Sequence, residues 1–504
     1  MRAARCGYDG LEVHCARSYL LGEFLSPFAN KRTDEYGGSL ENRTRIVREI
    51  IQRLRERVGD TIIGIRIIGD ERVEDGLSNP EVVEICQVLE REGIDYVGMS
   101  MGHGPNAEMI FPPMAFERGP FVDVAAALKK AVNVPFYATH RIRDVTLAEE
   151  MVAKGQADIV SLTRPSLADP EIANKAREGR ADDIRPCIAC LEGCYARVRL
   201  GLPITCLANP AAGREAEFRI TTADIGRKVA VVGGGPAGLE AARVLASRGH
   251  RVDLYERTGE LGGQMRWAAA LPVRGEMFDV VRWQIGQVKK LGVQILLNTE
   301  ATIATLKAGG YEAVVVATGG AYVREAPAWA AGVPTITVPE AFDLTLPAGA
   351  TVVVLDRDGH SKPMGFAERF ADAGHQTVLM TEAADFGVDW DDLNVKLTMQ
   401  RLRDKGVRFV SKMQDPRFDG STLHVRHEGW PVRIADVATI VLADRPVAHD
   451  GLARQIDDEW PEIEPARRGR RRGAAPRDGR HLRRLSRRPR GGNAARVRRR
   501  PPLT

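Results

Sequence analysis

Short apolar runs alternate with amphipathic stretches over the first 180 residues. The apolar runs, each four to seven residues long and each expected to form a strand, are residues 10–13, 61–67, 96–99, 134–137 and 159–162. Residues 41–58 and 79–92 repeat their apolar positions at helical spacing, so they are expected to form helices. Strands that alternate with helices form βαβ units, so this region predicts an α/β fold with a parallel sheet.

A polar or charged side chain follows each of these strands. In chain order they are His14, Arg66, His103, His140, Arg141, Thr163 and Arg164. In a parallel β/α barrel, the loops at the carboxyl ends of the strands carry the chemistry. The pattern therefore favours part of a TIM (β/α)8 barrel with its candidate residues at one end.

Several of these side chains admit both a catalytic and a structural interpretation. His14 can orient a substrate carbonyl or nitro group, and Tyr19 can donate a proton, but a structural histidine and a half-buried tyrosine fit the same positions. Arg66 can face an electron-rich flavin ring or form a surface ion pair. His103 is a candidate second donor, although the GHGPN segment around it also fits a flexible loop.

Arg141 and Arg164 follow the last two predicted strands, where β/α barrels commonly bind phosphate.

Four of the seven cysteines fall within 20 residues. They form the pattern C-x2-C-x3-C-x11-C, made by Cys187, Cys190, Cys194 and Cys206. Soft thiolates suit iron–sulfur clusters or zinc, and zinc sites more often pair two C-x2-C units. We favour an iron–sulfur cluster, with zinc and unliganded thiols as the alternatives. Cys6, Cys15 and Cys86 are assigned no role.

A dinucleotide-binding pattern begins after the cysteines. Residues 229–232 predict a buried strand, and a G-x-G-x-x-G motif follows, made by Gly233, Gly235 and Gly238. The next predicted strand, residues 251–255, ends in Glu256, where an acid would accept a hydrogen bond from a ribose hydroxyl. Strand, glycines, helix and acid together make this a specific signal for a Rossmann unit.

Two later segments extend this pattern. The sequence GELGGQ at residues 259–264, which includes Gly263, offers another glycine-rich approach to a nucleotide. A second Rossmann-like unit is expected from residue 351, where TVVVLD predicts a buried strand. The loop after that strand, residues 357–365, lacks the G-x-G-x-x-G motif.

Length and charge narrow the class of protein. The 504 residues suggest two to four domains. The net charge of +5 is misleading, because residues 467–504 hold 16 arginines against one acid, so the remainder carries about −10. An acidic body argues against nucleic-acid binding by the folded part. Without an apolar run of about 18 residues or a signal peptide, we expect a cytoplasmic protein that does not bind membranes.

The segments EVHCARSYL at residues 12–20 and YLLGEFLSPFANKRTDEYGGSLENR at residues 19–43 closely resemble the old yellow enzyme family. The order of barrel, cysteine pattern and G-x-G-x-x-G resembles the long branch of that family, which includes bacterial 2,4-dienoyl-CoA reductase and trimethylamine dehydrogenase. The resemblance covers residues 7 to about 465.

This resemblance implies a TIM barrel that holds FMN, a [4Fe–4S] cluster, and a domain that binds FAD or ADP, with NAD(P)H as a possible donor. Tyr19 matches the family's proton donor, His14 its substrate-orienting histidine, and His103 a second acid. Arg66 matches the arginine beside the flavin. The positions that match FMN phosphate ligands are Arg141, Thr163 and Arg164. The four clustered cysteines match the cluster ligands, and the three glycines with Glu256 match the FAD motif.

The expected domains follow from these motifs. They are a partial FMN-binding barrel (1–175), a cluster-bearing linker (176–222), an FAD or dinucleotide domain (223–345), a second Rossmann-like domain (346–445), a return to the FAD domain (446–466) and an arginine-rich tail (467–504).

The sequence departs from the family pattern in four places. Family barrels have about four more β/α units before this segment, so about half of the FMN pocket is expected to be missing. The composition of the tail indicates translation after a frameshift in GC-rich DNA, with a nucleic-acid-binding arm as the alternative. The loop at residues 357–365 is closer to the amine dehydrogenase branch. Arg17 stands where the family usually has asparagine or histidine, which suits an anionic or polarised substrate.

We therefore expect an NAD(P)H-dependent ene-reductase that acts on an activated C=C bond of a small molecule. One alternative is an amine dehydrogenase that passes electrons to an external acceptor, such as an electron-transfer protein. The other is a truncated, non-catalytic remnant. A homo-oligomer is compatible with either enzyme.

Overall fold

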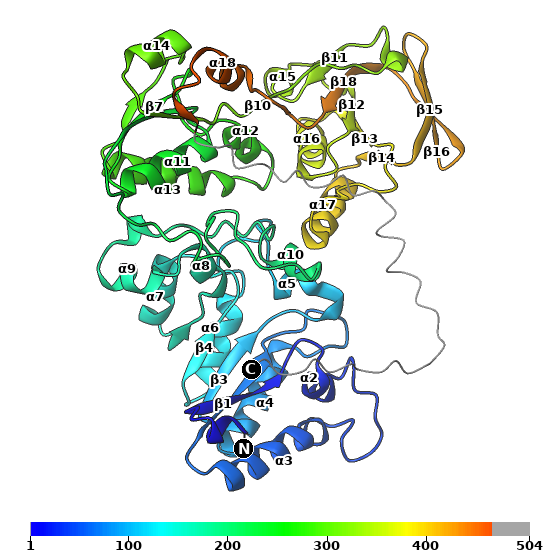
Figure 1. Cartoon of the computed structure of the whole chain (residues 1–504). Coiled ribbons are helices and arrows are strands. Elements are labelled where there is room, and N and C mark those ends of the chain that lie inside the picture. The colour runs from blue at the N-terminus through cyan, green and yellow to red at the C-terminus, as the bar shows by residue number, and fades with distance from the viewer. Residues whose placement is uncertain (1, 466–504) are drawn as a thin grey trace, which may run out of the picture.

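Three five-stranded parallel sheets organise residues 2–465, which are the residues that this computed structural model describes. Figure 1 shows the first sheet at the blue and cyan end of the molecule and the other two side by side above it. The expected tail, residues 467–504, lies outside the described residues.

The first sheet is the predicted series of βαβ units. Its strands pair in chain order: β1 (Gly10–Cys15), β2 (Ile62–Ile68), β3 (Tyr96–Ser100), β4 (Phe136–Ala138) and β5 (Ile159–Val160). The longer helices between them are α3 (Leu40–Val58), α4 (Asn79–Arg91), α6 (Val122–Ala131) and α7 (Val145–Ala153). The predicted helices begin or end within one residue of α3 and α4. Ser39 caps α3 by accepting a hydrogen bond from Asn42 N at 3.3 Å.

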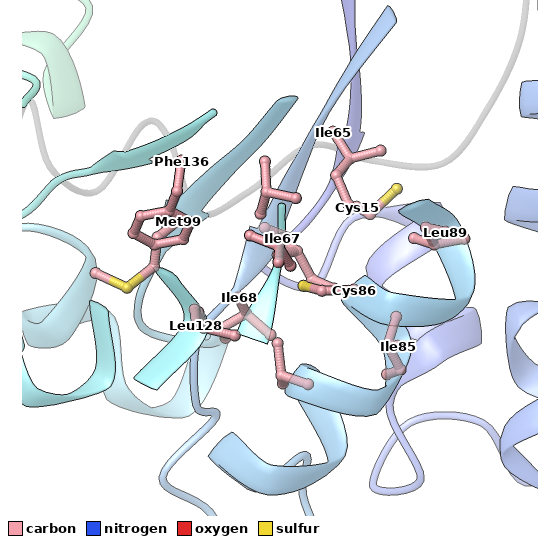
Figure 2. Close-up of a cluster of buried hydrophobic side chains, with 14 of the residues drawn as sticks. Cys15, Ile65, Ile67, Ile68, Ile85, Cys86, Leu89, Met99, Leu128 and Phe136 are labelled. Atoms are coloured by element: carbon pink, nitrogen blue, oxygen red, sulfur yellow. The ribbon is translucent and has the colours of Figure 1, made fainter. Parts of the chain in front are cut away.

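One face of this sheet packs against its helices and forms a dry core (Figure 2). The side chains labelled there are Cys15, Ile65, Ile67, Ile68, Ile85, Cys86, Leu89, Met99, Leu128 and Phe136. Because strand side chains alternate between faces, Val13 and Cys15 of β1 enter the core, whereas Glu12 and His14 point to the other face. The sequence alternation of β1 thus separates packing residues from candidate functional ones.

The second sheet is the predicted Rossmann unit. Its order is β20 (Glu464–Pro465), β9 (Ala313–Val316), β6 (Lys228–Val232), β7 (Arg251–Tyr255) and β8 (Gln294–Leu296). Helices α11 (Pro236–Ser247) and α13 (Met277–Lys290) pack against each other beside it. Glu464 lies opposite Ala313, so the chain returns to this sheet after it has formed the third.

The third sheet has the order β11 (Thr335–Thr337), β18 (Val437–Ala443), β12 (Thr351–Asp356), β13 (Gln376–Met380) and β14 (Arg408–Val410). Its helices include α16 (Ser361–Asp372) and α17 (Asp392–Asp404). Strand β11 pairs with β18, although the expected boundary at residue 345 assigns it to the preceding domain. With three residues, β11 carries too little periodicity to show which sheet it joins.

An antiparallel sheet extends from this third unit and was not predicted. It consists of β15 (Met413–Phe418), β16 (Leu423–His427) and β17 (Trp430–Ile434). These strands contain two prolines, Pro416 and Pro431, and they lack the apolar runs that indicate buried strands.

The remaining elements are short. They are α1 (Arg2–Arg5), α2 (Leu20–Leu25), α5 (Ala107–Ile110), α8 (Thr163–Ala168), α9 (Ile172–Arg177), α10 (Tyr195–Arg199), α12 (Met265–Ala270), α14 (Ile303–Ala308), α15 (Glu340–Asp343), α18 (Gly451–Glu459), β10 (Gly320–Ala321), β19 (Val447–Ala448) and three 3-10 turns, at 104–106, 181–183 and 328–330. Among the helices of residues 2–465, none has the length and apolarity required to cross a membrane.

The cysteine-bearing segment joins these units. Arg143, from the first unit, donates to Cys187 O at 2.7 Å, and Asn394, from α17, donates to Cys190 O at 3.2 Å. The cysteine backbone is therefore held from two sides by side chains that are distant in sequence.

Candidate active site

A hollow of about 830 Å³ opens at the carboxyl ends of the strands of the first sheet. Four of the predicted cofactor residues line it together: Arg66, Arg141, Thr163 and Arg164. Five of the fifteen residues that line it are arginines, which suits an anionic ligand that bears a phosphate.

The Arg66 side chain is held by side chains of neighbouring strands of the first sheet. Its Nε lies 2.9 Å from Glu12 Oε1, and its guanidinium lies 4.4 Å from the ring centroid of Tyr137. The hydroxyls of Tyr96 and Tyr137 each donate to Glu12 Oε2 at 3.2 Å. Glu12 thus anchors the arginine. Glu12 is a functional residue beyond those predicted from the sequence, although its alternation with His14 along β1 was a usable signal.

His14 and Tyr19 lie beside the hollow rather than among the residues that line it. Their ring centroids are 5.3 Å apart, and Tyr19 is 62% exposed. Partial burial, reinforced by the charges of Arg17 and Arg66, lowers the pKa of His14. A neutral imidazole at pH 7 can donate one hydrogen bond to a substrate without adding a further charge.

Arg17 lines the hollow, and its Nε donates to Ser100 Oγ at 2.8 Å. The unusual cation at this position is therefore held against β3 and faces the candidate ligand space.

The phosphate candidates differ in how they are bound. Arg164 donates to Pro112 O at 2.9 Å, and Thr163 begins the short helix α8. The guanidinium of Arg141 donates to Phe116 O at 2.7 Å and lies 3.2 Å from Glu276 of α13. Arg141 therefore shares its charge with an acid of the second unit, which no pattern local to residue 141 could indicate.

His103 is separated from the hollow. It is 5% exposed, its ring packs edge-on against Phe28, and its Nε2 lies 3.6 Å from Glu71 Oε1. Neither ring nitrogen has a hydrogen-bond partner within the described residues. The expected second donor is thus buried beside an acid.

The four clustered cysteines surround a second, smaller hollow of about 360 Å³. Cys187, Ala189 and Arg164 line both this hollow and the larger one, so the two share a wall. Burial raises the pKa of the Cys190, Cys194 and Cys206 thiols, so a cation is required to hold them as thiolates.

The geometry of these thiols bears on the choice between zinc and a cluster. Within residues 2–465, no group of three Cys, His, Asp or Glu side chains converges on a position for one metal ion. A zinc ion needs four ligands about 2.0–2.3 Å from one point, and a [4Fe–4S] cluster needs four thiolates, one for each iron. Four cysteines line the hollow, which is the number of ligands that either group requires.

The glycines of the first Rossmann unit are packed as a nucleotide loop requires. A Cβ on Gly238 would lie 1.8 Å from Gly233 O, and Gly233 has a φ of +110°. Glu256 Oε2 accepts from Gly234 N at 2.8 Å, and a Cβ on Gly263 would lie 3.1 Å from Gly235 Cα. The predicted glycines and the acid therefore converge on one place.

An aromatic cavity of about 830 Å³ adjoins this loop. It is lined by Pro236 and Gln264 and by the rings of Trp267, Tyr322 and Phe342. The cavity extends from the glycine loop toward the third sheet, and it has room for a planar ring.

In the second Rossmann-like unit, backbone amides of the loop after β12 donate to a carboxylate of the same unit, that of Asp356. Asp356 Oδ1 accepts from Asp358 N at 3.0 Å and from Gly359 N at 2.7 Å. In nucleotide-binding Rossmann units, the amides of this turn face the pyrophosphate. Here an internal acid engages them, in agreement with the missing glycine motif.

Comparisons with known proteins agree with this architecture. The family model described as "NADH:flavin oxidoreductase / NADH oxidase family" matches residues 1–183, and the one described as "NAD(P)-binding Rossmann-like domain" matches residues 231–281. An NADH oxidase of Thermoanaerobacter brockii is 36% identical over 417 residues, which is 81% of this chain and 63% of that protein. Residues 1–183 belong to the NADH:flavin oxidoreductase / NADH oxidase family.

Two solved structures extend the likeness across most of the described residues. A 2-naphthoyl-CoA reductase complex has a TM-score of 0.83 and 29% identity, with 90% of this chain and 69% of that chain covered. Histamine dehydrogenase from Rhizobium sp. 4-9 has a TM-score of 0.83 and 28% identity, with 92% and 70% covered. The predicted fold class, a partial TIM barrel followed by Rossmann-like units, is confirmed.

This chain spans less than two thirds of the NADH oxidase. The relatives of this family include both reductases and dehydrogenases, so the family name alone does not fix the direction of the reaction.

Proposed function

We propose that this chain forms part of a flavin-dependent oxidoreductase in which the larger hollow binds FMN and the four cysteines bind a [4Fe–4S] cluster. The observation that carries this proposal is the shared wall between the two hollows, made by Cys187, Ala189 and Arg164. Groups bound in adjoining hollows are close enough for direct electron transfer. When bound, the flavin would exchange a hydride with the substrate, and the cluster would carry single electrons.

The protein side chains have separate tasks in this proposal. Arg66, fixed by Glu12, presents a cation where an electron-rich ring would lie. Arg164 and Thr163 would bind the phosphate, together with Arg141 to the extent that Glu276 leaves its charge available. Tyr19 would donate a proton to substrate carbon, and His14 would orient the activating group.

The first Rossmann unit would bind FAD or ADP. The glycine loop would face the pyrophosphate, and Glu256 would turn from Gly234 N to a ribose hydroxyl. The aromatic cavity beside the loop would hold a planar ring of that ligand.

For the direction of the reaction, we propose reduction of an activated C=C bond with NAD(P)H as the electron source. The proximity of Tyr19 to His14 supports this direction, because alkene reduction needs a proton donor beside a group that polarises the alkene. A second candidate is oxidation of an amine, with electrons leaving to an external acceptor. The loop after β12 favours that candidate, because the Asp356 carboxylate engages the amides of Asp358 and Gly359, which would otherwise be available to NAD(P)H.

Anaerobic half-reactions of the flavin-loaded protein distinguish the two directions. For an ene-reductase, NADPH bleaches the flavin absorbance, and 2-cyclohexen-1-one restores it. Dimethylamine would bleach the flavin only in the amine dehydrogenase. If neither reductant bleaches a bound flavin, both directions are wrong.

Tyr19→Phe tests the proton donor. We expect reoxidation by 2-cyclohexen-1-one to slow by about 100-fold or more, because general-acid catalysis typically contributes that much. Reduction of the flavin by NADPH should be unchanged. Tyr8→Phe, at another tyrosine that is 67% exposed, is the matched control. Reoxidation at the wild-type rate in Tyr19→Phe would contradict the assignment.

A further inference from the structure

Arg274 lies in the loop between α12 and α13, at the junction of two hollows. One hollow, of about 480 Å³, is lined by Cys190 and Glu192 of the cysteine segment. The other is the aromatic cavity beside the glycine loop. Arg274, Met277 and Ser361 line both, and Arg274 is the charged residue of the three. It therefore stands between a candidate cluster ligand and the candidate nucleotide site.

The guanidinium of Arg274 lacks a partner there. Its Nε is buried without a hydrogen-bond partner, and the structure shows no ion pair for it within the described residues. Its nearest ring is Trp390, whose centroid lies 5.5 Å from the guanidinium carbon. A partly buried cation is stabilised when negative charge compensates it.

The acids nearest to Arg274 are engaged with other groups. Glu192 lies 3.3 Å from His360 Nε2, and Asp391 accepts hydrogen bonds from the backbone and side chain of Asn394. Together with Cys190, these acids are the groups whose negative charge acts on Arg274. Cys190 and Arg274 line the same hollow, so negative charge at the Cys190 sulfur is charge that Arg274 is placed to meet. Arg164 lines the neighbouring cysteine hollow.

We propose that Arg274 is a positioning residue whose fixed charge stabilises the electron-rich state of a [4Fe–4S] cluster bound by Cys190 and its three companions. This inference rests on the proposed function, since it requires that cluster. A fixed cation in a poorly solvated region lowers the free energy of the more negative redox state, so it raises the midpoint potential. Arg274 also lines the aromatic cavity, so its charge acts on the side of the cluster that faces the proposed FAD or ADP.

The test is an anaerobic redox titration of the iron-loaded protein, followed by the cluster's electron paramagnetic resonance signal. In Arg274→Gln, we expect the equilibrium constant for one-electron reduction to fall by about tenfold, which is a decrease of about 59 mV. Arg274→Lys keeps the charge and should retain most of the wild-type potential. Arg282→Gln, in α13 and 64% exposed, is the matched control, because solvent and salt screen an exposed charge.

Glu192→Gln provides a test of opposite sign. It removes a negative charge beside the same thiol, so we expect the potential to rise. A purely structural disturbance would not move the two variants in opposite directions.

The outcomes separate this inference from the function on which it rests. If the wild-type protein binds no iron, the proposed function fails and this inference fails with it. If Arg274→Gln binds iron at the wild-type potential, only this inference is overturned. Should Arg274→Gln lose its iron, Arg274→Met carries the test. The inference is also supported if both neutral variants lose their iron while Arg274→Lys retains it, provided that the iron-free proteins melt at the same temperature. If Arg274→Lys loses its iron as well, the inference is overturned.

Discussion

The seven thiols of this chain occupy three different environments. Cys6 is exposed, the four clustered cysteines are partly exposed, and Cys15 and Cys86 are buried in the core of the first sheet (Figure 2). Burial raises the pKa of both core thiols to about 12. Since the thiolate is the reactive form, environment rather than residue type decides their reactivity.

Alkylation with iodoacetamide, read by mass spectrometry, checks this ordering. In the iron-free folded protein, we expect Cys6 to react first. Cys15 and Cys86 should react at least about 100-fold more slowly than Cys6. Iron loading should protect the four clustered cysteines and leave Cys6 reactive. All seven should react alike in denaturant, which is the control. Rapid modification of Cys86 in the folded chain would contradict the buried assignment.

For single residues, spacing within one segment of the sequence predicted the cysteine and glycine sites but not the residues that bind distant partners. The cysteine pattern and the glycine motif are read within one segment, and the structure brings each set together around one hollow or loop. Glu12, Arg143 and Glu276 were missed because their partners, Arg66, Cys187 O and Arg141, are 44 or more residues away. Pairings of this kind depend on tertiary structure, which a single sequence does not display.

The turn between β6 and α11 depends on a close backbone approach. Gly238→Ala would place a methyl group 1.8 Å from Gly233 O, and a backbone atom cannot move aside as a flexible side chain can. We expect ADP affinity, measured by calorimetry, to fall by at least about tenfold.

Gly286→Ala, inside α13, is the matched control. No atom lies within 4 Å of the added methyl group, so this variant should bind ADP normally and gain about 0.5–1 kcal/mol of stability. Normal ADP binding in Gly238→Ala would exclude this loop as the nucleotide site.

The 3-10 turn at residues 181–183 holds the linker against α13. Asp183 accepts from Lys290 Nζ at 2.6 Å and from Gln287 Nε2 at 3.0 Å, and these contacts lower its pKa to about 2. A depressed carboxyl pKa contributes stability above its unfolded value of about 3.9, and this contribution is lost as the pH falls toward 2.

Asp183→Asn should therefore lower the free energy of unfolding by about 1 kcal/mol at pH 7, a magnitude reduced by partial exposure. The difference from wild type should shrink as the pH falls below about 4. Urea titrations at several pH values measure it, with Asp182→Asn, at the exposed neighbour, as the control. A difference that stays constant with pH would show that the contact is not electrostatic.

Elements were predictable where periodicity was long or apolar. Helices α3 and α4 and strands β2, β6 and β12 combine clear patterns with buried faces, and each was found close to its bounds. The sheet of β15 to β17 was missed because its strands are only five or six residues long and prolines interrupt two of them. Short antiparallel strands are stabilised mainly by their cross-strand neighbours, which the chain order alone does not identify.

On the scale of the whole molecule, ion pairs join the first and second units. Glu276 and Asp279 of α13 face Arg118, Arg141 and Arg143. These contacts set the glycine loop, the cysteine segment and the cationic hollow in one arrangement. The order of these parts along the chain predicted the units, which Figure 1 shows, but the ion pairs between them follow only from the three-dimensional structure.

The central claim is that four thiols hold an iron–sulfur cluster against the wall of a flavin site. The most direct measurement is the iron, acid-labile sulfide and flavin content of the anaerobically prepared protein, beside Cys187→Ser and the control Cys6→Ser. We predict about four irons and four sulfides with bound FMN in the wild type and in Cys6→Ser, and loss of iron in Cys187→Ser. One zinc per chain, or iron content that Cys187→Ser leaves unchanged, would contradict the claim.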